Sequence, residues 1–117
     1  MAARLRQLLA KDTILTTPGC YDAVSAKLVE RAGFQCTFMT GFGVAAVHGE
    51  PDTQLITYSD MVGQLSSICD ALDDVVVIGD GDTGYGNALN VKRTTAGYAK
   101  AGERNVYQAR STIRAEY

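Results

Sequence analysis

The chain has 117 residues, the length of about one domain, and its 46% hydrophobic and 21% charged residues are typical of a globular protein. Eleven basic residues against thirteen acidic ones give a net charge of −2, and without a basic cluster this balance excludes a typical nucleic-acid-binding protein. No apolar run approaches the ~20 residues of a membrane span and the first residues lack a signal-peptide core, so we expect a cytoplasmic protein with no membrane partner.

The first part of the chain is predicted to form a helix, a strand and a second helix. Residues 5–10 are typical of a short leading helix, and the β-branched run TILTT at 13–17 predicts a first buried strand. Asp22 is a suitable N-cap for a helix over 23–33, whose apolar residues recur at helical spacing. Gly33 is expected to end this helix.

Two further strand–helix pairs follow. Their strands are short, continuous apolar runs, as expected of strands covered on both faces, and their helices show apolar residues at helical spacing. The predictions are a strand at 36–40, a helix at 60–72 capped by Ser59 with a stripe of Met61, Leu65, Ile68 and Leu72, a strand at 75–78, and a helix at 91–102 capped by Asn90. The three cysteines lack a CxxC spacing, so they are expected to be reduced, with Cys36 and Cys69 packed in their elements.

The order of these elements, one helix and then three βα units, predicts an α/β fold. Alternation of this kind indicates a parallel sheet with right-handed crossovers. A flavodoxin-like open sheet and a (β/α)₈ barrel both begin in this way, and periodicity does not choose between them. Residues 103–117 have only scattered apolar residues and do not look like a fourth core strand.

The stretch 75–90, VVVIGDGDTGYGNALN, carries the clearest sign of chemistry. A predicted strand leads directly into a loop with two carboxylates, Asp80 and Asp82, among four glycines. Functional sites of parallel α/β folds lie at the carboxyl ends of strands, and adjacent carboxylates repel unless a cation neutralises them or one takes a proton. Oxygen ligands on a short loop suit Mg²⁺. The alternative is that the aspartates only cap turns and the following helix.

Two shorter segments are weaker candidates. The sequence TGFG, which begins at Thr40, follows the second strand, where backbone N–H groups and a hydroxyl can bind a carboxylate or phosphoryl oxygen. A glycine-rich turn without a binding role is the alternative. Asp52 lies in the sequence GEPD, and could either join the metal site or cap a turn after Pro51.

Four segments resemble the phosphoenolpyruvate mutase/isocitrate lyase superfamily, and most closely its carboxyvinyl-carboxyphosphonate phosphorylmutase-like branch. They occur in the same order as in that family and cover most of the chain, from about residue 5 to residue 102. The segments are PGCYDAVSAKLVERAGF (18–34), FMTGFGVAA (38–46), GEPDTQLIT (49–57) and IGDGDTGYGNALNVKRT (78–94).

The resemblance implies a (β/α)₈ TIM barrel, often assembled as a homo-tetramer, that makes or breaks C–C or P–C bonds next to a 2-oxo acid through an enolate that Mg²⁺ stabilises. It implies that Asp80 and Asp82 hold the metal and that Asp52 is a third acidic residue near it. It also implies that Thr40, Gly41 and Phe42 bind the substrate carboxylate, with Thr40 at a position where many relatives have Ser.

The sequence departs from the family pattern after residue 102. The family continues into an IEDQ-like strand end and a KxCGH-type catalytic loop, and residues 103–117 resemble neither. We therefore expect a partial barrel domain of about three βα units at 1–102 and a divergent tail at 103–117, truncated and with weak or no catalysis by this chain alone. No catalytic residue is assigned. The alternative is a non-catalytic fragment that docks on full-length subunits or has no function.

Overall fold

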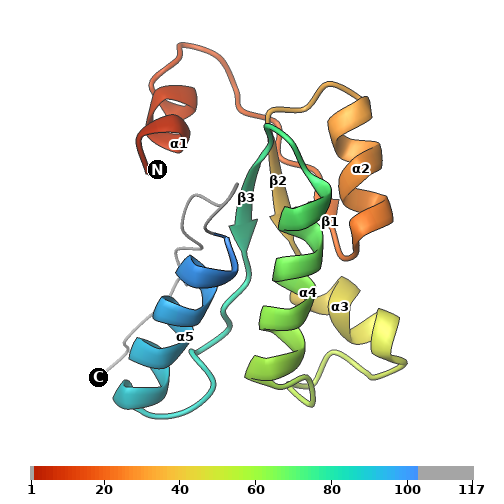
Figure 1. The fold of residues 1–117 in the computed structure, drawn as a ribbon, viewed down its shortest axis with the longest axis vertical. Helices are drawn as coiled ribbons and strands as arrows, with labels where there is room; N and C mark the ends of the chain where they lie inside the picture. Colours follow the sequence, from red (N-terminus) through yellow and green to blue (C-terminus); the bar gives the residue numbers. More distant parts are fainter. Residues whose placement is uncertain (1, 103–117) are drawn as a thin grey trace.

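Three short parallel strands form the centre of the fold, and helices connect them (Figure 1). The computed structural model of the protein describes residues 2–102, so the tail predicted at 103–117 lies outside the described residues. The strands lie in the order β1-β2-β3, each parallel to the next. In chain order the elements are α1 (Ala2–Leu9), β1 (Gly19–Cys20), α2 (Ala23–Arg31), β2 (Cys36–Met39), α3 (Gly41–His48), α4 (Tyr58–Ala71), β3 (Val76–Gly79) and α5 (Ala88–Ala101).

The strands β2 and β3 are covered on both faces, as their continuous apolar sequences predict. On one face Met39 and Val77 join the main hydrophobic core, and on the other Cys36 and Val76 pack with Leu8 of α1. In Figure 1 the strands point downward, α1 lies near the end where they begin, and α3 lies near the end where they finish. The carboxyl ends of the strands therefore meet the loops that precede α3 and α5.

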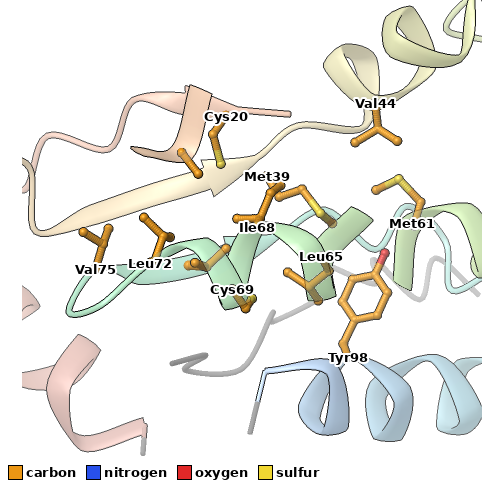
Figure 2. Packing of buried hydrophobic residues seen from close by; sticks show 12 residues of the cluster. Cys20, Met39, Val44, Met61, Leu65, Ile68, Cys69, Leu72, Val75 and Tyr98 are labelled. Carbon is orange, nitrogen blue, oxygen red and sulfur yellow. The ribbon is translucent and has the colours of Figure 1, made fainter. Parts of the chain in front are cut away.

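The main core lies against α4, where one stripe of side chains faces the sheet (Figure 2). Met61, Leu65 and Ile68 occupy successive turns of this helix and are at most 1% exposed, and Leu72 follows the helix at 2%. Tyr98 reaches the same core from α5. Burial of side chains of this size stabilises the fold by about 1.5–3 kcal/mol each, so the predicted stripe is confirmed as the main attachment of α4.

The predicted strand at 13–17 is wrong. The first strand lies further along the chain at Gly19–Cys20, and Ile14 is 95% exposed. The partners of β2 explain the difference: the Phe38 N–H donates to the Pro18 carbonyl and the Thr40 N–H donates to the Cys20 carbonyl. Local β-propensity therefore does not decide which residues enter the sheet, because the pairing partner selects them.

Two predicted helix starts are wrong by two or three residues, because each helix begins with a capping box. Thr57, not Ser59, caps α4, and its hydroxyl and the Asp60 carboxylate each accept a backbone N–H from the other residue. Asn87 caps α5, and the predicted cap, Asn90, is its partner in that box. The longest helices, α4 and α5, have 14 residues each, and no helix within residues 2–102 is long and apolar enough to cross a membrane.

One described helix, α3, is absent from the predicted elements. It has Gly at its first and third positions, and glycine lowers helix propensity, so TGFG has the composition of a turn. Thr40 caps the helix through its hydroxyl, which accepts the Gly43 N–H at 3.4 Å. Gly43 is required there, because a Cβ would lie 2.6 Å from the Cβ of Tyr21.

The cap of α2 gives the fold a predictable response to acid. The Asp22 carboxylate accepts the Ser25 N–H at 2.7 Å, and this bond lowers the pKa of Asp22, which confirms Asp22 as the predicted cap. A lowered pKa contributes stability above the ordinary pKa of an aspartate, and this contribution is lost as the pH falls through the lowered value.

We therefore expect Asp22→Asn, which keeps a good cap but removes its titration, to lose less stability than the wild type on acidification. Thermal unfolding of both proteins by circular dichroism at pH 7 and pH 2.5 measures the difference. Because a cap contributes about 1 kcal/mol, the wild type should lose up to that much more free energy of unfolding. Equal losses in the two proteins would contradict this role of Asp22.

Candidate metal and carboxylate site

The site is built where β2 and β3 end. Met39 and Gly79 are register partners at the last position of these strands, so Thr40 and Asp80 leave the sheet side by side. The Asp80 carboxylate accepts the Gly41 N–H through Oδ2 at 3.2 Å. A Cβ at Gly41 would lie 3.0 Å from that same oxygen, so glycine permits the close approach. The structure therefore brings a predicted metal ligand and a predicted substrate-binding amide into direct contact.

The segment 80–87, called the acidic loop from here on, has an unusual backbone. Four of its residues have positive φ: Asp82 at 45°, Gly84 at 87°, Tyr85 at 61° and Gly86 at 141°. For residues other than glycine this region costs about 1–3 kcal/mol each, and it persists only where surrounding contacts impose it. One such contact lies within the loop, since the Asp82 N–H donates to Oδ1 of Asp80 at 3.1 Å.

Helix α5 supplies two further contacts, and their residues are not among the site residues predicted from the sequence. The Tyr98 hydroxyl donates to the Asp80 carbonyl at 2.7 Å, and the Thr94 hydroxyl donates to the Gly84 carbonyl at 3.0 Å. Both side chains are buried, at 2% and 3% exposed. A threonine and a tyrosine four residues apart on the core face of a predicted helix are the signal that could have found them, because buried hydroxyls need hydrogen-bond partners.

The loop concentrates negative charge. The carboxylate of Asp82 is partly buried although the residue as a whole is exposed, and this partial burial raises its pKa. The negative charge of Asp80 raises the pKa further, and Asp52 adds to the effect. The Tyr85 hydroxyl opposes this rise in part. No ion pair formed within residues 2–102 includes any of these three aspartates. Carboxylates that repel one another without a basic partner form a place where a cation is favourable.

The donors fit Mg²⁺ in type and number, because this ion is commonly bound by one or two carboxylates and keeps several waters. Asp80 and Asp82 would be those two ligands. Asp52 lies in an exposed turn that the Thr53 N–H closes onto the Pro51 carbonyl at 2.8 Å. Within residues 2–102 no group of three or more acidic, histidine or cysteine side chains is arranged to hold a metal ion, so Asp52 does not complete a three-ligand cluster in this structure.

Two predicted substrate-binding residues and one predicted metal ligand lie beside two different hollows. Thr40 and Phe42 line an open hollow of about 510 Å³ together with Tyr21, and Phe42 is 65% exposed. Asp82 lines another, of about 500 Å³, together with Tyr85 and with Arg93. The guanidinium of Arg93 lies over the Tyr58 ring, 4.6 Å from its centroid. Asp80, Asp82 and Gly41 are thus linked by hydrogen bonds, whereas Thr40 and Phe42 face a separate hollow.

Comparison with known proteins identifies the class to which this fold and site belong. The family model described as phosphoenolpyruvate phosphomutase matches residues 5–106. The chain belongs to this family, within the phosphoenolpyruvate mutase/isocitrate lyase superfamily, and the predicted resemblance is confirmed. Its solved relatives are (β/α)₈ barrel enzymes, so the three-stranded parallel sheet corresponds to part of such a barrel, and the barrel is favoured over a flavodoxin-like sheet.

Three relatives illustrate the match. The 2,3-dimethylmalate lyase of Eubacterium barkeri is 46% identical over 102 residues, which are 86% of this chain and 35% of the relative. The chloroplastic carboxyvinyl-carboxyphosphonate phosphorylmutase of Arabidopsis thaliana is 39% identical over 100 residues, 85% of this chain and 30% of that protein. A phosphonopyruvate hydrolase solved with oxalate and Mg²⁺ has a TM-score of 0.80 at 31% identity, over 86% of this chain and 35% of the solved chain. The chain thus spans about a third of the length of these relatives.

Proposed function

We propose that this chain carries the metal- and carboxylate-binding part of an Mg²⁺-dependent carbon–carbon lyase or phosphorus–carbon mutase. Its substrate would be a 2-oxo acid or a related carboxylate that reacts through an enolate. The observation that carries the proposal is the contact between Asp80, which leaves β3, and the Gly41 N–H, which begins α3 after β2. A group that can bind a cation and a group that can bind a carboxylate thus meet at the carboxyl edge of the sheet.

Each of these residues has a separate task in the proposed reaction. Asp80 and Asp82 would hold Mg²⁺, with Asp52 nearby, and the bound ion supplies positive charge that neutralises the negative charge developing on the substrate oxygen. The N–H groups of Gly41 and Phe42 occupy the first turn of α3, where backbone donors lack helical partners and favour an anion. Because the Gly41 N–H donates to Asp80 in this structure, a substrate carboxylate must replace Asp80 as its acceptor.

The relatives support the substrate class. One acts on 2,3-dimethylmalate, and phosphonopyruvate hydrolase binds oxalate together with Mg²⁺. Oxalate is a small dicarboxylate that resembles a 2-oxo acid in its enolate form, so it is a suitable probe.

We further propose that the 117-residue chain binds such ligands but turns them over weakly or not at all, because residues 2–102 provide three strands of a barrel that has eight. Rapid turnover of oxaloacetate, 2-methylisocitrate or phosphoenolpyruvate by the purified chain would overturn the proposal of weak or absent turnover.

Isothermal titration of the 117-residue chain with Mg²⁺ and then oxalate tests the binding proposal. We expect Mg²⁺ to bind first and oxalate to bind only to the protein that already holds Mg²⁺, because the dicarboxylate needs the positive charge. Asp70→Asn is a matched control, because it removes one exposed negative charge from α4 and should leave both steps unchanged. Oxalate binding of equal strength without Mg²⁺, or no binding of Mg²⁺, would contradict the proposal.

Exposed apolar side chains on α2 favour a second candidate function. Val24 and Leu28, one helical turn apart, are 68% and 60% exposed, and α2 contacts β1, whose only strand partner among residues 2–102 is β2. We propose as the alternative that this edge docks on a full-length subunit of the family. Co-elution of the tagged chain with a purified full-length relative in size-exclusion chromatography would favour docking, and separate elution would exclude it for that relative.

A further inference from the structure

Helix α5 presents two buried hydroxyl groups to the acidic loop, one helical turn apart. Thr94 donates to the carbonyl of Gly84 at 3.0 Å, and Tyr98 donates to the carbonyl of Asp80 at 2.7 Å. The hydroxyls of Tyr85 and Tyr98 also lie 3.4 Å apart. Thr94 and Tyr98 thus hold the loop near its middle and at its first residue.

The backbone around these two anchored carbonyls requires such support. Asp82 and Tyr85 have positive φ, a region that side-chain-bearing residues adopt only where the surroundings impose it. The ring of Tyr85 also packs edge-on against Tyr58, with centroids 6.3 Å apart. Burial raises the pKa of Tyr98 to about 12, so this hydroxyl is protonated at neutral pH and can donate.

We propose that Thr94 and Tyr98 are positioning residues, whose hydroxyls fix the backbone of the acidic loop in the conformation that presents Asp80 and Asp82 to a divalent cation. The inference rests on the proposed function, since it concerns the same loop. Neither residue would touch the metal or the substrate. Their effect on binding passes through the two carbonyls to which they donate.

The test uses the full 117-residue chain and Mn²⁺, whose free concentration is measured by electron paramagnetic resonance. Thr94→Val and Tyr98→Phe remove a hydroxyl with little change of shape, and each is expected to weaken Mn²⁺ binding about three- to tenfold, the effect of one lost hydrogen bond. Thr94→Ser restores a hydroxyl and should return the affinity toward that of the wild type. Thr95→Ala is the matched control, because its hydroxyl donates to the Val91 carbonyl within α5 and does not reach the loop.

Amide hydrogen exchange separates positioning from a general loss of stability. Without metal, Thr94→Val and Tyr98→Phe should speed exchange of the Asp82 and Gly84 amides while the amides of α2 keep their wild-type rates. Affinity and loop exchange equal to those of the wild type would overturn the inference and leave the proposed function intact. A wild-type chain that binds no Mn²⁺ would overturn the proposed function, and the metal role of Thr94 and Tyr98 with it. Faster exchange in α2 as well would show that the two substitutions destabilise the whole fold. Thr94 and Tyr98 would then have only a structural role, and the inference would be overturned.

Discussion

Asp82→Asn is expected to raise the thermal midpoint of the metal-free chain at pH 7 while weakening Mg²⁺ binding by more than about tenfold, the lower end of what changes at metal sites cost. The higher thermal midpoint and the weaker Mg²⁺ binding have one cause, the negative charge of Asp82. Partial burial of its carboxylate and the charge of Asp80 raise the pKa of Asp82, so its ionisation opposes folding. The same ionised carboxylate would be a ligand for the metal. Asparagine carries no charge and tolerates the φ of 45° at this position.

The stability gained by Asp82→Asn should depend on pH. A raised pKa means that the cost of ionising Asp82 is absent below the ordinary pKa of an aspartate and appears as the pH rises through the raised value. The advantage of Asp82→Asn should therefore vanish near pH 3 and reach its full size at pH 7. The gain is small, because Asp82 is exposed and water screens its charge. Thermal unfolding at both pH values, without metal, measures it.

Asp80→Asn distinguishes the role of the Asp80 carboxylate from that of Asp82. Oδ1 and Oδ2 of Asp80 each accept a backbone N–H, from Asp82 and Gly41, and an amide can accept only one of these bonds. This variant should therefore lose about 1–3 kcal/mol of stability and also lose metal affinity. If Asp80→Asn and Asp82→Asn shifted the midpoint in the same direction, the assigned difference between the two carboxylates would be wrong. If both variants bound Mg²⁺ as tightly as the wild type, Asp80 and Asp82 would not be metal ligands.

The sequence predicts those parts of the fold that local composition determines. The apolar runs of β2 and β3 need no partner to be recognised, and the stripe of α4 follows from helical spacing alone. Glycine at position 33 predicts the end of α2, and Gly33 follows the helix with a φ of 85°. The position of the first strand depends on which residues pair with the edge of β2. The run at 13–17 has a composition more typical of a strand than residues 19–20, but it does not lie where β2 can pair with it.

The candidate site likewise has a part that the sequence predicts and a part that it does not. Its location could be predicted, because Asp80 follows a strand directly and functional sites in parallel sheets lie at that end. The contact between Asp80 and Gly41 joins residues that are 39 positions apart, so only the register of β2 with β3 reveals it. The supports from Thr94 and Tyr98 depend on the rotation of α5 about its axis, which a pattern of apolar residues at helical spacing defines only coarsely.

Gly84→Ala is expected to cause a large loss of stability, because both the backbone conformation and a close contact with α5 disfavour a side chain at this position. Gly84 has a φ of 87°, and an added Cβ would lie 2.5 Å from Cγ2 of Val91 and 3.2 Å from its Cα. The left-handed backbone costs a residue with a side chain about 1–2 kcal/mol, and overpacking adds about 1–3 kcal/mol. We therefore expect the free energy of unfolding to fall by roughly 2–5 kcal/mol, measured by urea denaturation followed by circular dichroism.

Gly33→Ala is the matched control, because Gly33 has nearly the same φ, 85°, but nothing lies within 4 Å of its Cβ position. It isolates the backbone penalty, and the difference between the two variants measures the clash with Val91. Adding Val91→Ala to Gly84→Ala removes the nearest atom, Cγ2, and should recover part of that difference, whereas the same addition to Gly33→Ala should recover none. Equal losses in Gly33→Ala and Gly84→Ala would mean that α5 does not press against the acidic loop at Gly84. The close packing of this loop on α5, on which the roles of Thr94 and Tyr98 depend, would then be wrong.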